Sequence, residues 1–190
     1  MSKAVLISIQ PQWCELIASG KKTVEVRKGR PKLETPFKCY IYCTKDPNLQ
    51  FWTGPRYSYA DDHSHNAFDR CGNGKVIGEF VCSGFDEFIP TEYGIKFRRF
   101  TSLYETRLSN TELRSYLNGS PGYGWRISDL VIYDKLKDLS EFIKPCKSDL
   151  YCEVCGMYSE FTEQCGNKAL RLSRPPQSWC YVEDLDGGKT

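Results

Sequence analysis

A mostly apolar run occupies residues 4 to 9, and the pattern changes directly after it. Residues 3 to 9 are rich in β-branched side chains and predict a strand. Pro11 then stands where the first turn of a helix tolerates proline. Apolar side chains recur after it at helical spacing, at Trp13, Leu16 and Ile17. The Ser19-Gly20 pair ends this predicted helix near Ala18.

A second strand is predicted at residues 23 to 27, and its two faces differ in chemistry. Successive side chains of a strand point to opposite faces. Val24 and Val26 therefore share an apolar face, while Thr23, Glu25 and Arg27 share a polar one.

The rest of the pattern indicates a mixed fold without a βαβ rhythm. A capping box begins a helix at Ser109, and Asn118-Gly119 ends it. Further strands are predicted at residues 37–43, 75–82, 127–133 and 179–183. These elements predict the α+β class: a mixed β-barrel with short flanking helices.

Length and composition place the chain among folded proteins with one core. With 190 residues, of which 40% are hydrophobic and 26% charged, a single domain is expected over residues 1–190. The turn-rich segment 45–74 is interpreted as a surface insertion. A net charge of +2 is too small for wrapping duplex nucleic acid, so any nucleic-acid site must be local. The first apolar run is too short for a signal peptide or membrane span, and a cytoplasmic protein is expected.

Ten cysteines in a cytoplasmic protein favour metal ligation or burial over disulfides. Four of them follow Pro145, within the segment 145–173 that precedes the last strand: Cys146, Cys152, Cys155 and Cys165. The middle pair has the C-x-x-C spacing that brings two thiolates to one tetrahedral zinc ion. Four sulfur ligands leave no open position, so we expect a structural zinc site that staples this loop. The alternative is a set of reduced, partly buried thiols.

Charged residues cluster where the second strand begins. Glu25 and Arg27 lie about 7 Å apart on one strand face, and Lys22 stands at the mouth of the strand after the Gly20 turn. Such a cluster can grip a polar ligand. The alternative is an ion pair that only closes the end of a barrel.

This segment resembles the ASCH family, whose hallmark G-x-K-x-x-E-x-R is met by Gly20, Lys22, Glu25 and Arg27. The resemblance covers most of the chain, including residues 74–80, 123–125 and 174–179. It implies a PUA-like barrel with a cleft suited to single-stranded RNA or a modified nucleoside. The cysteine loop is similar to a variant of bacterial and phage-borne members.

The resemblance also implies catalytic candidates. Some ASCH proteins are amidohydrolases that act on N4-acetylated cytidine and others are ribonucleases, and both uses place the hallmark lysine in the catalytic centre. Lys22 inherits that role, with Glu25 as its partner and Glu105 as the counterpart of a more distant catalytic glutamate. In the amidohydrolases a threonine stands at the position of Glu25, which argues against that reaction here.

Three aromatic residues near the predicted strand ends are candidates for base stacking: Tyr123, Trp125 and Trp179. Arg126 is the candidate phosphate partner beside them. The alternative is that the two tryptophans close the core.

Three functions remain open from the sequence. The first is binding of RNA or a modified nucleoside without chemistry. The second is hydrolysis of a nucleoside amide or of RNA, using Lys22. The third is a protein-interaction or transcriptional adaptor that makes contact through the zinc loop.

Overall fold

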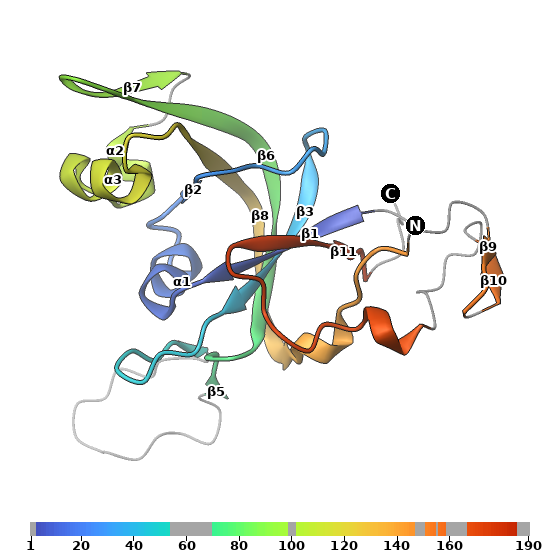
Figure 1. The fold of residues 1–190 in the computed structure, drawn as a ribbon. Helices are drawn as coiled ribbons and strands as arrows, with labels where there is room; N and C mark the ends of the chain where they lie inside the picture. The colour runs from blue at the N-terminus through green and yellow to red at the C-terminus, as the bar shows by residue number, and fades with distance from the viewer. Residues whose placement is uncertain are drawn as a thin grey trace, which may run out of the picture.

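A mixed sheet of seven strands forms the centre of the computed structural model, which describes residues 3–53, 70–98, 102–146, 151–154, 156–158 and 167–185. The strands follow the order β11-β1-β3-β6-β8-β2, and β7 pairs with β6 (Figure 1). Their bounds are β1 (Lys3–Ile9), β2 (Val24–Arg27), β3 (Phe37–Cys43), β6 (Val76–Thr91), β7 (Gly94–Arg98), β8 (Gly122–Lys137) and β11 (Trp179–Glu183).

Smaller elements surround this sheet. The helices are α1 (Pro11–Ala18), α2 (Leu103–Thr106) and α3 (Asn110–Leu117), with 3₁₀ turns η1 (Leu139–Glu141) and η2 (Lys168–Leu170). Two small two-stranded sheets pair β4 (Trp52–Thr53) with β5 (Arg70–Cys71), and β9 (Tyr151–Cys152) with β10 (Met157–Tyr158), both antiparallel. No helix in the described part of the chain is long and apolar enough to cross a membrane.

β1 is buried from Ala4 to Ile9 because both of its faces are covered. It runs parallel to β3 and antiparallel to β11. Val5, Ile7 and Ile9 belong to the main core, whereas Ala4 and Leu6 pack on the other face of the sheet. The strand predicted at residues 3 to 9 is thus confirmed as a central strand.

The predicted closed barrel is wrong, because the sheet stays open between β2 and β1. Among the described strands, β2 and β11 end the hydrogen-bonded order and no backbone ladder joins them. A side chain spans the gap instead: Arg27 Nη2 donates to the carbonyl oxygen of Ser8, 2.5 Å away. We call this opening between β2 and the end of β1 the seam. The α+β class itself is confirmed.

The predicted helices are confirmed where the sequence carried caps. α1 has Pro11 in its first turn, and the N-cap Ser109 of α3 accepts a hydrogen bond from the Glu112 amide at 3.2 Å. Helix α2 and strand β7 were not predicted. The α3 stripe of Leu113 and Leu117 packs against Val24 and Val26, which fixes the apolar face of β2.

The additions to the core fold are described only in part. In the segment 45–74, β4 and β5 pair at the base of the predicted insertion, and the residues between them lie outside the described ranges. The interpretation of this segment as an insertion into a single domain stays a prediction.

Two glycines of β6 give a matched test of the packing between β6 and β8. A Cβ added at Gly78 would lie 2.3 Å from the Val131 carbonyl oxygen, whereas one added at Gly84 would meet its nearest atom at 3.9 Å. We expect Gly78→Ala to lower the free energy of unfolding by about 1 to 3 kcal/mol, because backbone would have to move. Urea denaturation measures this, and equal stability of Gly78→Ala and Gly84→Ala would contradict the tight approach of the two strands.

Candidate functional site

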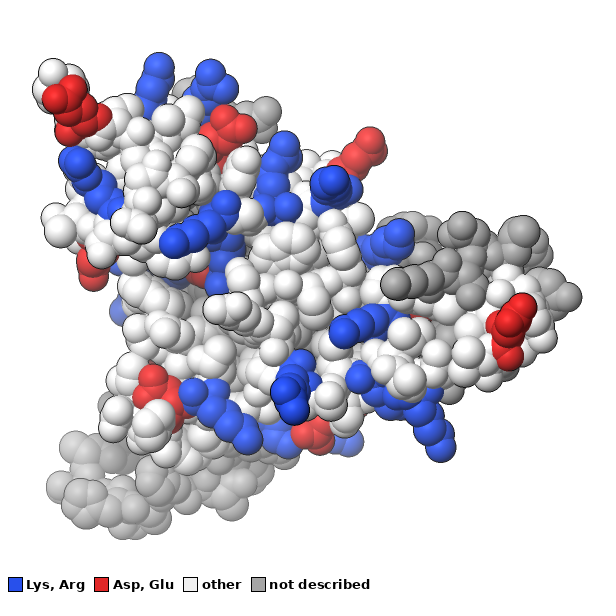
Figure 2. All heavy atoms as spheres, viewed as in Figure 1, with Lys and Arg blue, Asp and Glu red and all other residues white. Residues whose placement is uncertain are grey.

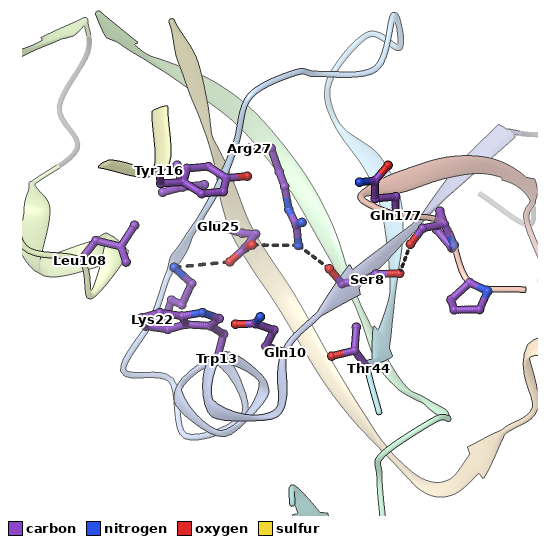
Figure 3. A pocket seen from close by; sticks show the side chains of 13 residues that line it. Ser8, Gln10, Trp13, Lys22, Glu25, Arg27, Thr44, Leu108, Tyr116 and Gln177 are labelled. Atoms are coloured by element: carbon purple, nitrogen blue, oxygen red, sulfur yellow. Dashed lines mark hydrogen bonds and ion pairs between the residues drawn. The ribbon is translucent and has the colours of Figure 1, made fainter. Parts of the chain in front are cut away.

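A cavity of about 540 Å³ lies at the seam (Figure 3). Its volume falls within the range of small-molecule sites in proteins. Its walls come from the hallmark strand β2, the end of β1, helix α1, the α2–α3 region and the segment before β11. The lining residues are Ser8, Gln10, Trp13, Lys22, Glu25, Val26, Arg27, Thr44, Leu108, Tyr116, Pro175, Pro176 and Gln177.

The turn after α1 positions the charged residues so that they line this cavity. Gly20 has a φ of +69°, a left-handed conformation that glycine adopts without strain. The amide of Lys22 then donates to the Leu16 carbonyl at 2.9 Å, and the chain enters β2. As predicted, Glu25 and Arg27 face the cavity while Val24 packs on the opposite side.

Lys22, Glu25 and Arg27 form a buried charge triad, with the carboxylate between the two cations (Figure 3). Lys22 Nζ lies 3.4 Å from Glu25 Oε2, and Arg27 Nη2 lies 3.0 Å from Glu25 Oε1. The side chains of Lys22 and Glu25 are only 2% and 7% exposed. The triad is therefore much less exposed to solvent than a surface ion pair. With two cations and one carboxylate, it carries one net positive charge.

Two further contacts hold Lys22. Its Nζ donates to the carbonyl oxygen of Thr106 at 2.6 Å, and it lies 5.1 Å from the centre of the Trp13 ring. Burial lowers the pKa of Lys22, the neighbouring Glu25 carboxylate opposes that shift, and Arg27 adds to it. The Lys22 amine consequently loses its proton at a lower pH than the amine of a solvated lysine.

Arg27 retains donor capacity toward the cavity. Its Nη2 serves both Glu25 and Ser8, but its buried Nε has no hydrogen-bond partner within the described structure. A buried donor without a partner is costly unless a ligand or water supplies an acceptor. The Arg27 Nε is therefore an unsatisfied buried donor in the wall of the cavity.

Two aromatic rings that the sequence analysis did not assign to the site flank the triad. Trp13 lies on one side of the Lys22–Glu25 pair and Tyr116 on the other (Figure 3). The Tyr116 residue is 41% exposed, and Lys28 Nζ lies 5.5 Å from its ring centre. Trp13 and Tyr116 occupy helical positions that also suit core residues, so spacing alone could not separate the two roles. The position of Trp13 shortly after the Ile9-Gln10-Pro11 turn was the available signal.

The predicted aromatic candidates do not line the cavity. Trp125 is fully buried, its Nε1 donates to the Gly29 carbonyl at 3.3 Å, and it packs against Phe37, Phe85 and Trp179. Trp179 and Tyr123 are partly buried beside it. Trp125 is therefore a core residue, as the alternative interpretation of these rings expected.

Arg126 and Glu105 also have structural partners. Arg126 makes a bidentate contact with the fully buried Asp86, at 2.9 and 2.7 Å. The Glu105 carboxylate accepts from the Ser102 amide at 2.8 Å and completes the capping box of α2. Neither residue lines the cavity.

The two described cysteines of the predicted zinc site, Cys146 and Cys152, do not line this cavity. Cys146 and Cys152 belong to one small apolar cluster with Ile143 and Leu170. The amide of Gly156 donates to the Cys152 carbonyl at 2.7 Å, and Gly156 has a φ of +70°, so the backbone at Gly156 turns back toward Cys152. Cys155 and Cys165 lie outside the described residues, and no group of three or more metal-ligating side chains occurs within the described ones.

Comparisons with known proteins support the fold. No protein-family model and no curated protein matches the sequence. Among solved structures, the chain is similar to ASCH from Zymomonas mobilis, with a TM-score of 0.51 and 17% identity over 97% of this chain and 90% of that one. A point mutant of that protein matches with a TM-score of 0.52 and 18% identity, over 96% of this chain and 92% of that one. The ASCH fold that the motif predicted is confirmed.

The triad makes stability depend on Glu25 and on pH. We expect Glu25→Gln to lower the free energy of unfolding by about 3 kcal/mol at neutral pH, because two buried cations lose their shared carboxylate. Glu34→Gln, at an exposed site, is the control.

The stability that Glu25→Gln loses should become smaller as the pH rises toward 10. Because burial lowers the pKa of Lys22 below its ordinary value of 10.5, the unfolded chain holds this proton over a pH range in which the folded chain has released it. Glu25→Gln removes the carboxylate that opposes this shift, so the free energy of unfolding of the variant rises with pH more than that of the unmodified protein. Chemical denaturation between pH 7 and 10 measures the effect, and a loss no larger than that of Glu34→Gln would contradict the buried triad.

Proposed function

We propose, from the ASCH fold and the cavity at its seam, that the protein binds a base of single-stranded RNA or a modified nucleoside. One observation carries the proposal: a buried charge triad and two aromatic side chains, Trp13 and Tyr116, line the same cavity. A nucleobase combines a flat apolar face with a polar edge, and RNA-binding sites use aromatic rings for the face and hydrogen bonds for the edge.

The lining residues divide between these two tasks. Trp13 and Tyr116 offer rings on which a base can stack, a contact that contributes about 1 to 3 kcal/mol. The guanidinium group of Arg27, which lines the cavity, offers N–H donors for a carbonyl oxygen or ring nitrogen. Gln10 and Gln177, both exposed at the rim, each add a donor and an acceptor.

Hydrolysis of the bound nucleoside or RNA is the second candidate, and the environment of Lys22 favours it. A lysine acts as a base or nucleophile only as the neutral amine, and burial lowers the pKa of Lys22. Glu25 acts in the opposite direction by stabilising the charged amine. In this candidate Lys22 exchanges a proton with the substrate, and Glu25 and Arg27 position it.

A panel of nucleosides and short RNAs tests both candidates on the same variants. We expect Trp13→Ala to weaken binding about tenfold or more, because a stacking face is lost. Lys22→Met should retain binding and abolish any product formation. Tyr93→Ala, at a residue that is 92% exposed and does not line the cavity, is the matched control. Calorimetry measures the affinities, and chromatography detects product from cytidine, N4-acetylcytidine and RNA.

The outcomes separate the two candidates. Product lost in Lys22→Met supports an enzyme, whereas binding without product in the unmodified protein supports a binding module. Failure of every ligand to bind at low salt, with the protein folded, would overturn the proposal.

We also propose that Cys146, Cys152, Cys155 and Cys165 bind a structural zinc ion. The packing of Cys146 with Cys152 and the backbone turn at Gly156 support this. Four thiolates would complete a closed tetrahedral site whose contribution is to stability rather than to catalysis. A stapled loop of this kind would also offer a surface for the adaptor role.

Metal analysis of the purified protein tests this site. We expect one zinc ion per chain, which Cys152→Ser should remove while lowering the melting temperature, because a closed zinc site contributes directly to folding. Cys180→Ser, at a half-buried thiol on β11, should retain the metal. Zinc content unchanged in Cys152→Ser, or absent from the unmodified protein, would contradict the proposal.

A further inference from the structure

A second cavity adjoins the first, and the two share wall residues. It has a volume of about 580 Å³, and Thr44 and Pro175 line both cavities. Its remaining lining residues are Tyr42, Lys45, Gly74, Asp138, Leu139, Ser140, Leu172 and Ser173. The two cavities therefore lie next to each other, on either side of Thr44 and Pro175.

Hydrogen bonds fix both walls of the second cavity. On one wall, the Gly74 amide donates to the Cys43 carbonyl at 2.8 Å and ties the end of β3 to the start of β6. On the other wall, Arg171 Nη1 donates to the Ser140 carbonyl at 2.9 Å, and the Leu172 amide donates to the Phe142 carbonyl at 2.9 Å. The second cavity is thus preformed rather than a gap between loose loops.

The chemistry of the second cavity differs from that of the first. Its aromatic residue, Tyr42, is only 4% exposed and offers little surface for stacking. Hydroxyl groups of Thr44, Ser140 and Ser173 line it instead. Such hydroxyls suit ribose and phosphate oxygens, which RNA-binding proteins contact along the backbone.

Lys45 supplies the positive charge at this cavity. Its side chain runs across Gly74, where an added Cβ would lie 2.8 Å from Lys45 Cε. The single carboxylate in the lining, Asp138, is paired with Lys75 at 2.5 Å. Lys and Arg side chains are also spread over the face of the molecule shown in Figure 2. An anionic group in the second cavity would accordingly meet a cation there.

We infer that the second cavity binds the sugar-phosphate of the nucleotide next to the base held in the first cavity. The ligand is then a strand of at least two nucleotides rather than a free nucleoside. This inference rests on the proposed function and assigns its substrate class, because a second cavity lined by hydroxyl-bearing residues and Lys45 adjoins the first.

Comparison of cytidine with cytidine-containing dinucleotides, extended on the 5′ or the 3′ side, tests the inference. We expect one of the two dinucleotides to bind about tenfold or more tightly than the nucleoside, the gain of one charge-assisted hydrogen bond. Lys45→Ala should remove this gain while leaving the nucleoside affinity unchanged. The slope of log affinity against log salt should fall by about 0.7 in that variant.

Two further variants sharpen the result. Ser173→Trp, at an exposed residue, should fill the second cavity and block the dinucleotide but not the nucleoside. Lys96→Ala, an exposed lysine on β7 outside both cavities, is the charge-matched control and should bind both ligands normally. Equal affinity for nucleoside and dinucleotides, or a gain that survives both Lys45→Ala and Ser173→Trp, would overturn this inference alone. Absence of binding by all these ligands would overturn the proposed function with it.

Discussion

The side chain of Arg27 spans the seam between β2 and β1, and the site depends on this contact. One guanidinium nitrogen reaches the Ser8 carbonyl on β1 and the Glu25 carboxylate on β2. A backbone ladder between the two edge strands, β2 and β11, would close the barrel and bring them to about 5 Å, which leaves no space for a ligand between them. The side-chain bridge from β2 to β1 leaves the cavity open.

Burying this bridge requires Glu25. An isolated buried cation is strongly disfavoured, and the carboxylate between Lys22 and Arg27 offsets the charge of one of them. The second positive charge is partly compensated by the Thr106 carbonyl and the Trp13 ring, both of which face Lys22. The triad, which lines the cavity, keeps one net positive charge, so the same arrangement that holds the strands also favours an acceptor-rich ligand.

The sequence predicted the parts of this site that follow from local geometry. Alternation along β2 assigned Glu25 and Arg27 to one face and Val24 and Val26 to the other, because strand period is a property of neighbouring residues. The Thr106 carbonyl could not be predicted in this way, since it lies 84 residues from Lys22 and is a backbone group of an unpredicted helix. The prediction of a closed barrel was wrong for a related reason. Closure depends on pairing between strands that are distant in sequence, and no local pattern specifies that pairing.

The protonation state of Lys22 depends on the ligand that the cavity binds. This dependence links the binding candidate to the hydrolytic candidate. An anionic ligand near Lys22 would raise its pKa and keep the amine charged, as a binding contact. A neutral ligand that excludes water without adding charge would lower the pKa further and favour the neutral amine. Glu25 limits the second effect, since its carboxylate stabilises the charged form. If phosphate groups lie in the second cavity, beyond Thr44, their charge acts on Lys45 first. Lys22 then meets mainly the uncharged base, the condition under which an amine buried in this way can exchange a proton.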